Sequence, residues 1–273
     1  MYQRIRVEPL AGVIGAEVSG VDLRKPLDAD VIGEIREAWL AHQVLFFRDQ
    51  PLSVDEHKTF ARRFGALHVH PVLQQMADQG HPEIVVLESH AKRPVVADRW
   101  HSDVTFEREP PLGSILRAVA VPDAGGDTMW ASMTAAYDAL SEPMKNVLAP
   151  LRALHTGAGF RRIATDKQTD ALAQNETTTH PVIRTHPETG KKAIFVNSTF
   201  TRAIEGMKPR EGEALLAFLY EHVASPEFSC RFRWRKDSLA MWDNRCTQHR
   251  VVADNLSAYR RMERVTLIGD RPY

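Results

Sequence analysis

The chain has 273 residues, 43% of them hydrophobic and 26% charged, and 35 basic side chains balance 35 acidic ones to a formal net charge of zero. This composition is typical of a globular protein with a large core, and the balanced charge argues against nucleic acid or an anionic membrane as a partner. Cys230 and Cys246 are too few for a disulfide scaffold and favour a reducing compartment. No signal-peptide pattern is present, and no apolar run approaches the roughly 20 residues that span a bilayer. We therefore expect a cytoplasmic protein.

Hydrophobic spacing in the first 65 residues predicts short strands and two helices. The expected elements are a strand and turn over 15–23, a helix over 28–43 and a buried strand over 44–47. Ser53 and Glu56 have the spacing of a capping box, which predicts the start of the second helix at residue 54. Gly65 is expected to terminate that helix.

From residue 83 onward, strand patterns dominate the sequence. The expected strands cover 83–89, 113–121, the residues after the glycine turn in 124–132, the two arms of a hairpin over 181–197 with its turn at 187–190, 238–244 and 261–270. A helix is expected after Pro209. Its inner face would carry Leu215, Leu216, Leu219 and Val223.

One segment departs from these patterns. Residues 166–179 are polar and lack aromatic side chains, so they read as a long mobile insertion. No stretch rich in proline, glycine and serine divides the rest of the chain. The patterns together predict one β-rich α+β domain, a barrel with helices packed outside it.

His101 and Asp103 stand two residues apart in the sequence RWHSDVTF, a spacing that is common by chance. His249, in MWDNRCTQHRVV, is a candidate third ligand. Two imidazoles and one carboxylate form a facial triad that leaves three positions of an octahedral ion open, which suits Fe(II), whereas a structural zinc would take four protein ligands. A lone histidine is more often structural, and Cys246 lacks a matching zinc ligand nearby. The histidines read as structural are His42, His57, His81, His90, His155, His180, His186 and His222.

Arg260 and Arg264 lie four residues apart in the last expected strand, so they point to the same face. Buried guanidinium groups are costly unless each meets an anion. Either the two arginines pair with Asp or Glu, or they bind two anionic molecules beside a metal.

Several segments together resemble the taurine dioxygenase family of Fe(II)/2-oxoglutarate-dependent oxygenases, over nearly the whole chain. They are FGALHVHP, WHSDVTF, GGDTMWAS, HPVIRTHPETGKKAIFVN, MWDNRCTQHRVVAD and YRRMERVTLIGDRPY. The resemblance implies a double-stranded β-helix (jelly-roll) core and a single dioxygenase domain over residues 1–273.

The resemblance also implies which residues bind the cofactors. His101, Asp103 and His249 would hold Fe(II), at which O₂ reacts. Arg260 would bind the distal carboxylate of the co-substrate 2-oxoglutarate, and the Thr128 hydroxyl would add a hydrogen bond to the same carboxylate.

For the substrate, Arg264 and His70 match the residues that bind the sulfonate in the family. Phe106 and Phe200 match apolar residues of the same pocket, although plain core packing explains them equally well. Two positions depart from the taurine pattern. Leu73 stands where a tyrosine is expected, and Ala97 replaces an asparagine that would face the taurine amine.

These residues predict hydroxylation of the carbon next to the sulfonate of taurine or a related organosulfonate, with release of sulfite, an aldehyde, succinate and CO₂. The alternatives are the same chemistry on an alkyl sulfate ester or a phenoxyalkanoate, a zinc hydrolase with the same ligands, or a jelly-roll metal-binding protein without turnover. The expected partner is a small anionic molecule, with no nucleic acid or membrane, and assembly into a homodimer or homotetramer is compatible with the sequence.

Overall fold

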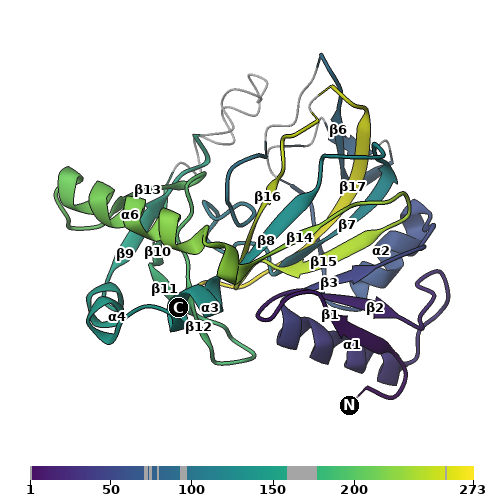
Figure 1. Cartoon of the computed structure of the whole chain (residues 1–273), viewed down its shortest axis with the longest axis horizontal. Coiled ribbons are helices and arrows are strands. Elements are labelled where there is room, and N and C mark those ends of the chain that lie inside the picture. The colour runs from purple at the N-terminus through teal and green to yellow at the C-terminus, as the bar shows by residue number, and fades with distance from the viewer. Residues whose placement is uncertain are drawn as a thin grey trace.

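The computed structural model describes residues 2–70, 73, 76–78, 80–92, 97–158, 177–255 and 257–273. Within these residues the protein is β-rich, and its strands form one large sheet and three small ones, with a few helices around them (Figure 1). No helix in the described part of the chain is both long enough and apolar enough to cross a bilayer.

The large sheet has nine strands in the order β1-β2-β3-β15-β7-β17-β6-β5, with β4 paired to β17. The strands are β1 (Arg6–Pro9), β2 (Ala16–Ser19), β3 (Val44–Phe47), β4 (Leu67–His68), β5 (Ala77–Asp78), β6 (His81–Ser89), β7 (Gly113–Ala120), β15 (Leu239–Asp243) and β17 (Arg260–Leu267). Their pairing is antiparallel except between β2 and β3. The strands predicted at 83–89, 113–121, 238–244 and 261–270 are therefore confirmed, with shifts of one to three residues at their ends.

A second sheet, in the order β14-β8-β16, packs against one face of the large sheet. Its strands are β8 (Thr128–Ser132), β14 (Ser229–Phe232) and β16 (Thr247–Val251). Aromatic side chains fill the space between the two sheets: Phe46 stacks on Phe232 at 4.1 Å between ring centroids and meets Trp130 edge to face. This layer matters for function because it supports the strand that carries His249.

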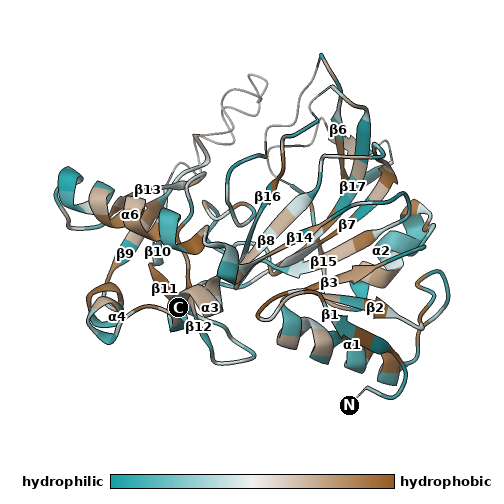
Figure 2. Cartoon of the chain, viewed as in Figure 1, coloured by the Kyte–Doolittle hydropathy of each residue, from teal (hydrophilic) through white to brown (hydrophobic). Residues whose placement is uncertain are grey.

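The other face of the large sheet is covered by α1 (Ala29–His42) and α2 (Val54–Arg62). In α1, hydrophobic residues alternate with hydrophilic ones (Figure 2), and Ile35 and Trp39 are buried against the sheet. Strand β3 lies between the two cores, since Val44 and Phe46 face the small sheet whereas Leu45 and Phe47 face the helices. Burial on both sides explains its unbroken apolar sequence.

The capping box of α2 is confirmed, because Ser53 accepts the backbone N–H of Glu56 and the Glu56 carboxylate accepts that of Ser53. The prediction that Gly65 terminates this helix is wrong. The helix ends at Arg62, and Arg63 caps it in an ordinary right-handed conformation with its N–H bonded to the Phe60 carbonyl. A tightened last turn satisfies this end of the helix, so no left-handed glycine is required.

The remaining elements form a third region around their own core. They are α3 (Met133–Asp138), α4 (Glu142–Leu148), β9 (Arg152–His155), β10 (Thr178–Pro181), β11 (Ile183–Thr185), β12 (Lys192–Ile194), β13 (Thr201–Ile204), α6 (Pro209–Val223) and η3 (Pro226–Phe228). The predicted hairpin is confirmed by the antiparallel pair β11–β12. Helix α6 is confirmed as well, with Leu216, Leu219 and Val223 buried and Leu215 half-buried.

The insertion predicted over 166–179 is only partly testable. Residues 166–176 lie outside the described residues. Thr178 and Thr179, which were expected to belong to the insertion, instead begin strand β10 and pair with His155 and Leu154 of β9. Their β-branched side chains favour extended backbone, and the partner strand decides their conformation.

Candidate active site

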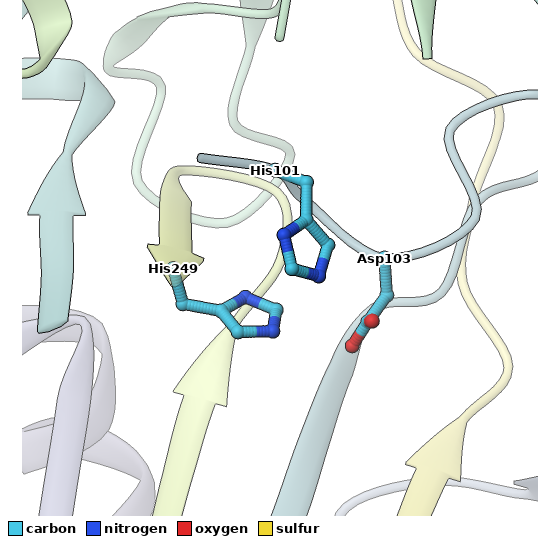
Figure 3. Close-up of side chains that lie close together, drawn as sticks. All are labelled: His101, Asp103 and His249. Atoms are coloured by element: carbon cyan, nitrogen blue, oxygen red, sulfur yellow. The ribbon is translucent and has the colours of Figure 1, made fainter. Parts of the chain in front are cut away.

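The two candidate histidine ligands face each other across an isolated antiparallel bridge, although 148 positions separate them in the sequence (249 − 101). The His249 N–H donates to the His101 carbonyl at 2.8 Å, and the His101 N–H donates to the His249 carbonyl at 3.1 Å. Asp103 lies beside them, and the three side chains point toward one another (Figure 3). Their ligand atoms all lie within 4.8 Å of one another, and all three residues are buried.

The hydrogen bonds of the histidines suit metal binding. His101 Nδ1 lies 2.8 Å from the Arg99 carbonyl, which can only accept, so Nδ1 carries the ring proton and Nε2 keeps a lone pair. His249 Nδ1 is buried without a partner among the described residues. Burial lowers the pKa of both imidazoles, so both are neutral near pH 7, as metal ligands must be.

Asp103 supplies the anionic ligand of the set. Burial by itself would raise its pKa, but the Arg264 guanidinium opposes burial most strongly, the Ser114 hydrogen bond adds to it, and the pKa of this carboxyl lies below its usual range. Arg264 Nη1 donates to Oδ1 at 2.6 Å, and the Ser114 hydroxyl donates to Oδ2 at 2.9 Å. Two neutral nitrogens and one ionised carboxylate fit an Fe(II) ion of the facial-triad type.

A second buried group, His186, Asp243 and Cys246, also has ligand atoms within 4.8 Å of one another, but its bonding does not suit a metal. His186 Nδ1 accepts two backbone N–H groups of the turn that follows it, so Nε2 carries the proton and donates to Asp243. Arg245 donates two side-chain hydrogen bonds to the same carboxylate. Burial raises the pKa of the Cys246 thiol, so no thiolate is available. These residues form a structural network, in agreement with the reading of His186 as structural.

The backbone that follows Asp103 is strained. Val104 has φ +51°, a left-handed conformation that β-branched residues rarely adopt. Its neighbour Thr105 is buried, and the Thr105 hydroxyl bonds to His155 Nδ1 at 3.0 Å and to Asn197 Nδ2 at 3.1 Å. These contacts from a separate sheet and loop hold the metal-site segment in its strained form.

Arg260 and Thr128, the candidate residues for 2-oxoglutarate, are also buried. Arg260 forms no ion pair among the described residues, and its Nε and Nη2 atoms are buried without partners there. Burial lowers the pKa of Arg260 to about 10, so the group stays cationic near pH 7. Thr128 Oγ1 accepts from Trp234 Nε1 at 2.9 Å, which leaves the hydroxyl proton to be donated elsewhere. A buried cation without a partner indicates a site for an anion.

The four candidate substrate residues are buried too, and contacts tie two of them to the metal site. Arg264 bonds to Asp103, and Phe200 packs edge to face on His101 with ring centroids 6.3 Å apart. Phe106 packs on Phe200 at 5.4 Å. His70 Nδ1 accepts the N–H of Leu73 at 3.1 Å, so its Nε2 carries the ring proton.

The electrostatics of His70 favour a neutral donor. Burial, together with the charge of Arg264, lowers the pKa of His70 to about 3. Of the two positions that depart from the taurine pattern, Leu73 is buried, and the Ala97 carbonyl accepts the N–H of Val251, two residues beyond His249.

Comparison with known proteins agrees with this geometry. Residues 6–266 match the family described as taurine catabolism dioxygenase TauD, TfdA family. The chain belongs to this family. It is 36% identical over 278 residues to an alkylsulfatase of Acinetobacter baylyi, covering 98% of this chain and 86% of that protein.

Two further proteins resemble the chain over most of their length. An alpha-ketoglutarate-dependent sulfate ester dioxygenase of Pseudomonas putida is 36% identical, over 97% of this chain and 90% of that protein. The crystal structure of a taurine dioxygenase from Burkholderia xenovorans superposes with a TM-score of 0.87 at 39% identity, covering 99% of this chain and 91% of that one. The chain is therefore an enzyme of the dioxygenase class.

Proposed function

We propose that this protein is an Fe(II)/2-oxoglutarate-dependent dioxygenase that hydroxylates the carbon attached to the sulfonate or sulfate group of a small organic anion. The hydroxylated product then collapses to an aldehyde with release of sulfite or sulfate, while 2-oxoglutarate becomes succinate and CO₂. The observation that carries this proposal is the buried Arg264, bonded directly to the candidate metal ligand Asp103. A cationic fork beside a metal ligand brings an anionic substrate next to the reacting centre.

His101, Asp103 and His249 would hold the metal, and Arg260 and Thr128 would bind 2-oxoglutarate. The Fe(II) ion with 2-oxoglutarate and O₂ supplies the oxidising chemistry when they are bound. The guanidinium of Arg260 would give the distal carboxylate charge-assisted hydrogen bonds. The Thr128 hydroxyl accepts from Trp234 and still has its own proton, so it would donate a further hydrogen bond to the same carboxylate.

Arg264 and His70 would bind the sulfonate or sulfate of the substrate. A guanidinium and a neutral imidazole N–H are both donors, and a tetrahedral oxyanion offers only acceptors. Phe106 and Phe200 would form the apolar wall that orients the carbon chain and excludes water. Leu73 and Ala97 offer no side-chain acceptor for an ammonium group, so an apolar chain would be preferred to the charged amine of taurine.

The fold supports the proposal. We infer that the large sheet and the sheet β14-β8-β16 form the two walls of a double-stranded β-helix, since they enclose one shared aromatic core. Residues 1–273 would then form one dioxygenase domain, with the metal site between the two walls.

Product analysis tests the function. Protein loaded with Fe(II) under reducing conditions is given 2-oxoglutarate, O₂ and one of three compounds: taurine, 1-hexanesulfonate or hexyl sulfate. We expect succinate with matching amounts of sulfite or sulfate, and faster turnover of the two hexyl compounds than of taurine. Asp103→Ala should abolish coupled turnover. Succinate formation that none of the three compounds stimulates would contradict the substrate class, and near-wild-type turnover by Asp103→Ala would contradict the metal site.

A further inference from the structure

The carboxylate of Asp103 is held by a small buried network that the reaction scheme above does not use. Ser114, on β7, donates its hydroxyl proton to Asp103 Oδ2 at 2.9 Å. Asn244, in the connection between β15 and β16, donates from Nδ2 to Ser114 Oγ at 3.4 Å. Asn244 Oδ1 also accepts the backbone N–H of Asp103 at 3.4 Å. The two residues therefore contact Asp103 at both its side chain and its backbone.

The directions of these hydrogen bonds follow from the chemistry of the groups. Trp242 Nε1 can only donate, and it lies 3.0 Å from Asn244 Oδ1, so the Nδ2 group of Asn244 faces Ser114. An ionised carboxylate can only accept, so the single hydroxyl proton of Ser114 goes to Asp103. Thr266, 3.3 Å from Ser114 Oγ, must then donate to that oxygen.

We propose that Ser114 is a positioning residue for the metal-binding carboxylate, with Asn244 holding Ser114 in place. Ser114 is fully buried, and Asn244 and Trp242 are nearly so, so water does not substitute for a lost contact. Arg264 engages the other oxygen, Oδ1, and the two donors on opposite oxygens fix the plane of the carboxylate. Partners of this kind orient metal ligands, and their loss costs about 10- to 100-fold in metal affinity.

A purely structural reading of Ser114 is that the tight space beside β15 and β17 requires a small side chain. Substitution by alanine separates the two readings, because it preserves the small volume and removes only the hydroxyl. Ser238 is the matched control. It is also a fully buried serine, and its hydroxyl bonds to Arg48 Nη1 and the Arg235 N–H, away from Asp103.

The test is a titration of chelator-treated protein with Co(II). Calorimetry gives the affinity, and the visible ligand-field bands report the coordination of the bound ion. We expect Ser114→Ala to bind Co(II) about 10- to 100-fold more weakly than wild type and to shift the bands. Ser238→Ala should change neither the Co(II) affinity nor the bands, even if it lowers the thermal stability as much as Ser114→Ala does. Wild-type affinity and bands in Ser114→Ala would overturn the proposal. If Ser114→Ala does not fold, Ser114→Cys, with its weaker donor, should show an intermediate loss, and unchanged affinity there would overturn the proposal equally.

This inference rests on the proposed function, because it takes Asp103 as a metal ligand. Asp103→Ala in the same titration distinguishes the two. If Asp103→Ala binds Co(II) like wild type, the metal site itself is wrong. If Asp103→Ala loses binding while Ser114→Ala keeps it, the metal site stands and the positioning role of Ser114 fails.

Discussion

Arg264 donates a 2.6 Å hydrogen bond to Oδ1 of Asp103, so the arginine assigned to the substrate is bound to the carboxylate assigned to the metal. Both side chains are buried. A cation that binds Asp103 and an anion that binds Arg264 each weaken this ion pair, and each thereby makes the other partner available. Metal binding and substrate binding should therefore assist each other, and by linkage the effect is reciprocal.

The first prediction concerns anion binding when the carboxylate is neutralised. In chelator-treated protein, Asp103→Asn removes the negative charge that competes for Arg264, so 1-hexanesulfonate should bind about tenfold more tightly than to wild type, a difference of about 1.4 kcal/mol. Loading wild type with Mn(II) should have the same effect, and Arg264→Gln should lose anion binding in every form. Isothermal titration calorimetry measures all of these affinities. Equal affinity in wild type and Asp103→Asn would contradict the competition.

The second prediction assigns 2-oxoglutarate to Arg260. Arg260→Ala should weaken its binding to the Mn(II)-loaded protein by roughly 2–5 kcal/mol, since one half of a buried charge pair is lost. Arg260→Lys should recover only part of this, because a lysine lacks the planar fork. Arg261→Ala is the matched control, as its side chain is partly exposed and pairs with Glu263. Calorimetric titration would refute the assignment if Arg260→Ala bound 2-oxoglutarate like the control.

Local features were predictable from the sequence, and nonlocal ones were not. The capping box of Ser53 and Glu56 depends on residues only three positions apart. The burial of both faces of β3 is visible in its sequence as four consecutive apolar residues. The prediction for the end of the same helix is wrong because glycine commonly terminates helices, whereas this helix ends earlier, at Arg62, with a right-handed residue as its cap. Thr178 and Thr179 were mispredicted because their strand exists only through pairing with β9.

The candidate site shows the same division. His101 and Asp103 form a local pattern. His249 is a candidate third ligand from the sequence, strengthened by the family resemblance, and the structure places it opposite His101. The sequence does not indicate a role for Ser114, because it lies in the strand sequence GSIL and nothing local distinguishes its hydroxyl. Its contacts reach 11 residues back to Asp103 and 130 residues forward to Asn244, so only the folded structure reveals them.

The third prediction concerns stability in acid. His57 is fully buried in α2, its Nε2 lies 3.1 Å from the Ile115 carbonyl, and burial together with Arg117 lowers its pKa to about 3. Below its ordinary pKa of about 6.5 the unfolded chain takes up a proton that the folded protein does not, so stability falls as the pH drops from 6.5 toward 3. At pH 5.0 this costs about 2 kcal/mol relative to pH 7.5.

His57→Gln keeps a donor for the Ile115 carbonyl and removes the titrating group. Urea unfolding at pH 7.5 and 5.0 should therefore show that the variant loses about 2 kcal/mol less than wild type between the two pH values. His222→Gln serves as the comparison, because its side chain is half-buried and lies in α6, away from this region. Equal losses in wild type and His57→Gln would show that His57 does not titrate differently in the folded and unfolded states.

The fourth prediction is that the buried group around Asp243 stabilises the fold and binds no metal. Asp243→Ala removes the acceptor of both Arg245 and His186 and leaves the buried Arg245 paired with Glu188 alone, which should destabilise the protein by about 3 kcal/mol in urea unfolding. We expect wild type and the folded variant each to bind one Co(II) per chain, whereas Asp103→Ala should bind none. A second equivalent of metal that binds to wild type but not to Asp243→Ala would contradict this prediction. It would show that the group binds a metal even though His186 Nδ1 accepts two backbone hydrogen bonds.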